Sequence, residues 1–122
     1  MLVIAMLTVS GCNREERGPL LAGGREVKSW IADLHNPKSE VRRQAVLKLG
    51  NVGDSDPSAA EGLAEALRDS DPMVRRAAVS AVGKLSKPNE DIMAWLRIMG
   101  DRDSDPRVRD YAKRAITHFE KE

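Results

Sequence analysis

The chain has 122 residues, and its 20 Lys and Arg nearly balance its 19 Asp and Glu. A chain of this length is expected to form one domain. A net charge of only +1 argues against a protein dedicated to binding nucleic acid or a membrane surface. A single Cys excludes an internal disulfide framework and multi-thiolate metal sites. The chain contains two His, two Trp, one Tyr and one Phe. So few imidazole and aromatic side chains argue against a metal site, a catalytic triad or a surface for stacking nucleic-acid bases. We therefore predict no metal, no cofactor, no catalytic residue and no nucleic-acid partner.

The N-terminal segment, residues 1–11, is uncharged and mostly apolar. Its apolar run is too short to span a bilayer, which takes about 20 apolar residues. It is typical of the apolar region of a secretory signal, although no Lys or Arg precedes it. The run ends in Val9-Ser10-Gly11-Cys12, and the sequence turns polar directly afterwards. We predict a signal peptide over 1–11; the alternative is an apolar N-terminus with an ordinary free thiol.

The segment Val9-Ser10-Gly11-Cys12 resembles the lipobox of bacterial lipoproteins, in which two small residues precede the Cys. The resemblance implies that Cys12 receives a diacylglyceryl group, that the chain is cut before it, and that the new N-terminus is acylated, for example with palmitate. Residues 12–25 would then be the lipidated Cys and a flexible tether rich in charge and Gly. In the enterobacterial form of that family an Asp after the Cys retains the protein at the inner membrane, so Asn13 favours the outer membrane of the bacterial cell envelope.

Residues 26–120 contain three repeats, at about 26–53, 57–86 and 89–119. An amphipathic run opens at Val41, Val74 and Val108, which are 33 and 34 residues apart. Apolar residues follow each Val at positions that share one helical face: Ala45, Leu49 and Val52; Ala78, Val82 and Leu85; Ala112, Ile116 and Phe119. A second apolar stripe precedes each run. The pattern predicts an all-α solenoid of three helical hairpins.

The turns agree with these boundaries. Asp56, Asp71 and Asp105 each precede a Pro, which predicts an N-cap followed by Pro at the first helical position. Asn36 or Ser39 is expected to cap the corresponding helix of the first repeat. The third turn is two residues longer than the others.

The segments Asp69–Ala78 and Asp103–Ala112 resemble HEAT-like repeats, an armadillo-type fold whose short form also occurs in phycobilin lyases. The first repeat matches less closely. The resemblance implies a structural ladder in which an Arg one residue after each Val pairs with turn acids. Its members are Arg42, Arg75 and Arg109 with Asp69, Asp71, Asp103 and Asp105.

The two ends of the stack differ in polarity. Gln44 and Lys48 stand where the second repeat has Ala77 and Ala81, which indicates an end repeat with one solvated side. The last repeat keeps Tyr111 and Phe119, so we expect a less well capped C-terminal end. That end is a candidate for self-association or for contact with a partner.

The acidic third turn prompts one metal hypothesis. Asp101, Asp103 and Asp105 alternate as in a calcium loop, but Pro106 and Ala112 occupy positions where an EF-hand needs Gly and Glu. Helix capping explains the carboxylates better than calcium does.

The side of the second helices that is expected to lie opposite the core is our candidate surface for binding a partner. Positions two, five, six and nine after each Val are expected to lie opposite the core, and the residues that we expect to contact a partner are Arg43, Arg76, Val79, Lys113 and Arg114. We predict a membrane-anchored, non-catalytic protein–protein interaction scaffold whose partner is an acidic or amphipathic peptide. Three alternatives remain open: a lyase-like or small-molecule-binding accessory subunit, a self-assembling structural solenoid, and a merely solvated face.

Overall fold

The structure is a computed structural model that describes residues 26–121. The predicted signal peptide, Cys12 and the tether lie outside the described residues. Over the described range the chain forms six α-helices and no strand. They are α2 (Val27–Asp33), α3 (Ser39–Gly50), α4 (Pro57–Ala66), α5 (Pro72–Val82), α6 (Glu90–Arg102) and α7 (Pro106–Glu120).

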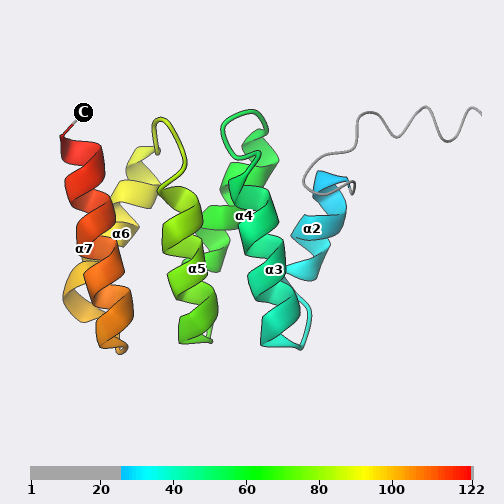
Figure 1. Cartoon of the computed structure of the whole chain (residues 1–122), viewed down its shortest axis with the longest axis horizontal. Coiled ribbons are helices and arrows are strands. Elements are labelled where there is room, and N and C mark those ends of the chain that lie inside the picture. The colour runs from blue at the N-terminus through cyan, green and yellow to red at the C-terminus, as the bar shows by residue number, and fades with distance from the viewer. Residues whose placement is uncertain (1–25, 122) are drawn as a thin grey trace, which may run out of the picture.

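The helices form three successive hairpins in two layers (Figure 1). Helices α3, α5 and α7 stand side by side in one layer, and α4 and α6 lie behind them. Each hairpin packs on the next mainly through this layer, where α3 contacts α5 and α5 contacts α7. The prediction of an all-α solenoid of three hairpins is confirmed.

The predicted apolar stripes form a continuous core. Val74, Ala78 and Val82 of α5 are 0% exposed, as are Val108 and Ala112 of α7. Val41, the corresponding residue of α3, is only half-buried because α3 belongs to the first hairpin. The buried surface is thus shared between repeats, which is why a single hairpin of this kind does not fold alone.

Aspartates cap three helices, as predicted. The Oδ1 atom of Asp56 accepts from the backbone N–H of Ser58 (2.9 Å), and those of Asp71 and Asp105 accept from Met73 and Arg107 (2.7 Å each). Hydrogen bonding from the Ser58 side chain lowers the pKa of Asp56. The Met73 N–H likewise lowers the pKa of Asp71. Because these pKa values fall on folding, the caps stabilise the protein above the ordinary carboxyl pKa and lose that effect as pH drops through the lowered values.

The expected cap of α3 is wrong. The N-cap residue of α3 is Lys38, and its side chain makes no cap hydrogen bond. The Oδ1 atom of Asn36 instead accepts from the N–H of Lys38 (2.9 Å) and so closes the turn before the helix.

The Arg ladder joins consecutive repeats. Arg42 donates from Nε and Nη2 to both carboxylate oxygens of Asp69 (2.9 and 3.0 Å), and hydrogen bonding with this carboxylate raises the pKa of Arg42. Arg75 makes the same bidentate pair with Asp103 (2.9 Å for both bonds). Each Arg thereby ties its own turn to the turn of the following repeat.

Two details of the ladder differ from expectation. Asp71 and Asp105 are helix caps and do not pair directly with the ladder arginines. Arg109 donates from Nη1 to the carbonyl oxygen of Asp103 (2.6 Å), and within residues 26–121 no carboxylate pairs with it. In both pairs the carboxylate comes from the following repeat, and within the described residues no repeat follows α7.

Polar residues close the C-terminal end of the α3–α5–α7 layer. Positions five and nine after Val41 are Val46 and Gly50, which are buried against the following repeat. On α7 the same positions carry Lys113 and Thr117, and both are exposed. This helix therefore presents a polar outer face, as an end repeat requires.

The expectation that Tyr111 and Phe119 leave this end uncapped is wrong. Tyr111 lies on the side of α7 that faces α5, with the guanidinium carbon of Arg76 5.6 Å from its ring centroid. Phe119 is half-buried against the core. Neither ring lies on the outer side of α7, because positions three and eleven after Val108 face the neighbouring helices.

The helices are also short. Among the described helices, none combines the length and the apolar character needed to cross a membrane.

Candidate binding face

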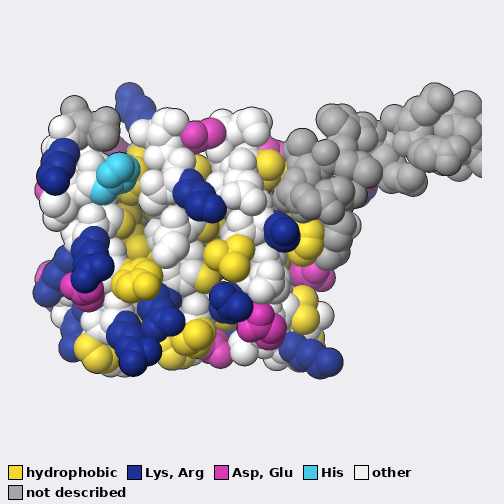
Figure 2. Space-filling model, in the orientation of Figure 1, with side chains coloured by type: hydrophobic (Ala, Val, Ile, Leu, Met, Phe, Trp, Pro, Cys, Tyr) yellow, Lys and Arg dark blue, Asp and Glu magenta, His cyan; other side chains and the backbone are white. Residues whose placement is uncertain are grey.

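The exposed surface of α3, α5 and α7 carries three adjoining depressions, which we call the second-helix face. It is shown in Figure 2, where Lys and Arg side chains are spread among hydrophobic ones. Six of the lining residues are Lys or Arg and none is Asp or Glu. Because the whole chain has a net charge of only +1, this lining concentrates positive charge. The cations are Arg43, Arg76, Lys84, Lys113, Arg114 and Lys121.

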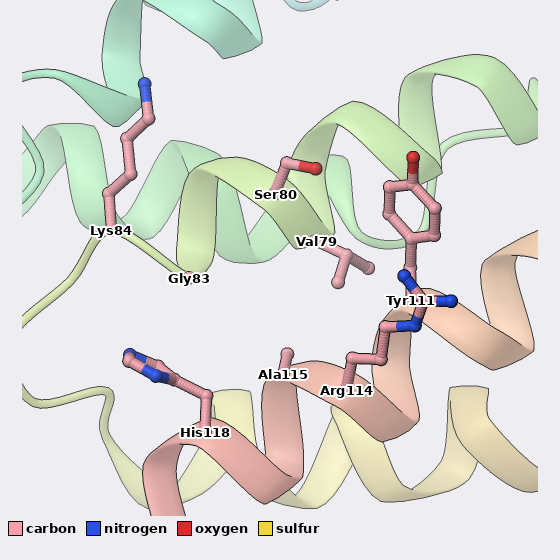
Figure 3. Close-up of a pocket in the computed structure, with 8 residues that line it drawn as sticks. All are labelled: Val79, Ser80, Gly83, Lys84, Tyr111, Arg114, Ala115 and His118. Carbon is pink, nitrogen blue, oxygen red and sulfur yellow. The ribbon is translucent and has the colours of Figure 1, made fainter.

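One of these depressions is a groove of about 370 Å³ between α5 and α7. Figure 3 shows Val79 and Ala115 on opposite walls, Tyr111 at one end, and Lys84 and His118 at the other. Ser80, Gly83 and Arg114 complete the lining. The groove therefore has apolar walls and a rim of hydroxyl, imidazole and cationic groups.

Two smaller depressions flank the groove. One shares Ser80 and Tyr111 with it and extends toward α3 through Arg43, Leu47 and Arg76. The other shares Arg114 and His118 with it and runs to the end of α7. The shared residues make the three depressions one continuous surface across the layer.

Three of the predicted contact cations engage neighbouring side chains. The Nη2 atom of Arg43 lies 2.9 Å from Oε2 of Glu40, and the same distance joins Nη2 of Arg114 to Oδ2 of Asp110. Arg76 stacks over Tyr111. Exposed pairs of this kind are worth little energetically and open readily for a ligand carboxylate. Lys113 is exposed at the outer edge of α7.

The predicted placement of Val79 opposite the core is wrong. Val79 is 2% exposed, because the fifth position after Val74 faces the following repeat. Its remaining surface lines the groove, where it is a wall residue and not a surface contact. The same periodicity buries Val46 completely.

The sequence analysis did not assign Lys84, His118 or Lys121 to this face. Lys84 and His118 both lie ten residues after the Val of their repeat, as Asn51 does in the first repeat. Lys84 Nζ is 3.1 Å from Asn51 Oδ1, so these positions form a row across the helices. Extending the repeat alignment by one position would have identified this row.

The described residues offer no evident metal centre. Within 26–121 no group of three or more His, Cys, Asp and Glu side chains is placed to hold a metal ion. In the acidic third turn, the carboxylates of Asp103 and Asp105 accept from Arg75 and from backbone N–H groups. These contacts explain both residues as parts of the scaffold.

A comparison with known families gives one result. A family model described as HEAT repeats matches residues 27–117, which is most of the chain and nearly all of the described part. No curated protein matches the chain.

Proposed function

We propose that this chain, which belongs to the HEAT repeat family, is a non-catalytic protein–protein interaction scaffold. HEAT repeats are consistent with such a role. In our proposal the second-helix face binds an acidic segment of a partner protein. The bound segment lies across α3, α5 and α7 and contacts the predicted residues Arg43, Arg76, Lys113 and Arg114 on the way.

The charge of the second-helix face is the observation that carries this proposal. Its three depressions are lined by six cations and no carboxylate. Arg43 and Arg114 pair only with exposed carboxylates of their own helices, Glu40 and Asp110, and a ligand carboxylate can replace such partners at little cost. An acidic segment therefore meets complementary charge on this face. Such recognition acts mainly through the association rate and weakens with salt.

The test is charge reversal on this face. We expect the full chain to bind a fluorescein-labelled poly-glutamate peptide at low ionic strength, measured by fluorescence anisotropy. Arg76→Glu combined with Arg114→Glu should weaken binding at least about tenfold, because two attractive contacts become repulsive.

The matched control is Arg102→Glu combined with Arg107→Glu, which makes the same change in net charge at two exposed residues outside the lining. This control should retain most of the binding. Equal losses in both double variants would show a net-charge effect and would contradict a specific face. Circular dichroism of each variant checks that the helices persist.

We further propose that the scaffold is a membrane-anchored lipoprotein of the bacterial cell envelope. The support is the Val9-Ser10-Gly11-Cys12 segment, which resembles a lipobox, and the abrupt change to polar sequence after it. Acyl chains on Cys12 would supply the anchor, since each buried methylene contributes about 0.8 kcal/mol and two or three chains hold firmly. Asn13 favours the outer membrane in organisms that sort lipoproteins by this residue.

A further inference from the structure

At one repeat position, α5 and α7 leave open space between them where α3 and α5 are in direct contact. Gly50 and Gly83 occupy the same repeat position, nine residues after Val41 and Val74. A Cβ added to Gly50 would lie 2.8 Å from the Cβ of Ala81, so α3 and α5 touch there. A Cβ added to Gly83 would have as its nearest neighbours, at 3.3 to 4.0 Å, only backbone atoms of its own helix.

A bulky residue distinguishes the more open interface. Three residues after its Val, α5 has Ala77, which is 9% exposed, whereas α7 has Tyr111, which is 37% exposed. The ring of Tyr111 points toward α5 and lies under Arg76. A ring at an interface position needs more room than a methyl group, which is consistent with the wider spacing of α5 and α7.

The groove that results combines two chemistries. Val79, Ala115 and the Tyr111 ring provide apolar surface, and Arg114 and His118 lie along its edge. Lys84 also lines the groove, with its Nζ turned away from α7 and 3.1 Å from Asn51 Oδ1. Its volume of about 370 Å³ is at the low end of the roughly 300–1,000 Å³ typical of ligand pockets. One large side chain therefore fits within it, with room left for the groups that flank it.

We infer that the α5–α7 groove is an anchor pocket for one aromatic or branched aliphatic side chain of the acidic partner segment. This inference rests on the proposed function and adds a specificity to it. The apolar walls select the anchor residue, and the cationic rim selects Asp or Glu on either side of it. A nucleic acid or an anionic membrane would engage the same cations and leave the apolar walls unused.

The experiment uses two labelled peptides that differ in one residue. Both are short poly-glutamate chains, one with a central Phe and one with a central Ala. We expect the full chain to bind the Phe peptide about tenfold more tightly, because Phe removes much more apolar surface from water than Ala does.

Filling the groove should remove this preference without removing the charge recognition. Ala115→Leu places extra methyl groups between the walls and should equalise the two peptides at the affinity of the Ala peptide. Gly83→Leu is a second filling variant that does not depend on tolerance at Ala115, because Gly83 has φ −61° and no side chain of α7 within contact.

The possible results test the anchor pocket and the binding of an acidic segment separately. Equal affinity of the unaltered chain for both peptides, or an undiminished Phe preference in both filling variants, would overturn the anchor pocket and leave the acidic-segment scaffold standing. Binding of neither peptide, with or without retention on phosphatidylglycerol vesicles, would overturn both proposals. Loss of the Phe preference alone in the filling variants supports the pocket.

Discussion

Individual residues at one repeat position can have different roles in this molecule. Gly50 is required by packing, since any side chain would meet Ala81 of the next helix. Gly83 has helical backbone angles and open space toward α7, so nothing in its surroundings demands glycine. The difference follows from the neighbouring repeat and not from the glycine itself.

Replacing each glycine with alanine tests this contrast. We expect Gly50→Ala to lower the free energy of unfolding by about 1–3 kcal/mol, because the added methyl overpacks a closed interface. Gly83→Ala should leave it unchanged or raise it by up to about 1 kcal/mol, because alanine restricts the unfolded chain. Urea unfolding followed by circular dichroism measures both; similar losses for the two variants would refute the open α5–α7 interface.

Turns also connect the helical elements across repeats. The side chains of Arg75 and Asp103 are only 13% and 7% exposed, and Arg75 also donates to the carbonyl oxygens of Asp69 and Ser70 (2.8 and 3.1 Å). The guanidinium therefore fixes the turn before its own helix and the turn of the next hairpin at once. Arg109 makes only the local half of this arrangement among the described residues.

Lysine substitutions compare an arginine that pairs with a carboxylate of the next repeat with one that contacts only a backbone carbonyl of its own turn. Lysine keeps the charge but cannot make a bidentate pair, so Arg75→Lys should cost about 2 kcal/mol of stability, since it loosens a partly buried ion pair. Arg109→Lys should cost less than about 1 kcal/mol, because no carboxylate pair is lost. Thermal unfolding of the two variants gives the comparison, and an equal cost would mean that the inter-repeat pair contributes nothing of its own.

At the scale of the whole molecule, the described residues 26–121 form a short stack with polar outer positions on α3 and α7. Gln44 is exposed and Lys48 half-buried on α3, and Lys113 and Thr117 are exposed on α7. These residues replace the small apolar ones that pack between repeats, which disfavours growth of the stack by addition of further copies. A bounded stack with one cationic face fits a binding module better than a self-assembling solenoid.

The proposed membrane anchor of the whole chain is tested by its mass and its location. Intact mass spectrometry of the protein extracted from bacterial membranes should show loss of residues 1–11 and an added mass of diacylglyceryl and acyl groups on Cys12. Cys12→Ser should abolish the added mass and release the protein from the membrane fraction. An unprocessed chain that begins at Met1 and carries no lipid would refute the lipoprotein proposal.

Periodicity in the sequence is sufficient to predict the three hairpins, the caps at Asp56, Asp71 and Asp105, and the residues of the core, because each depends on local spacing along one helix. The Arg ladder follows from family resemblance, but the sequence leaves open which Asp each Arg contacts. That choice depends on how far one turn lies from the next repeat, which is a distance between elements.

The binding face also combines features that the sequence predicts with features that depend on how the helices pack. The sequence by itself placed cations on the second helix of each repeat, on the side expected to lie opposite the core, because helical spacing assigns each position to a face. Only the tertiary structure decided that Val79 is a buried wall, that Tyr111 faces α5, and that α5 and α7 stand apart. The physical reason is that a groove is the space left between two helices, and that space depends on the bulk of the side chains that meet there.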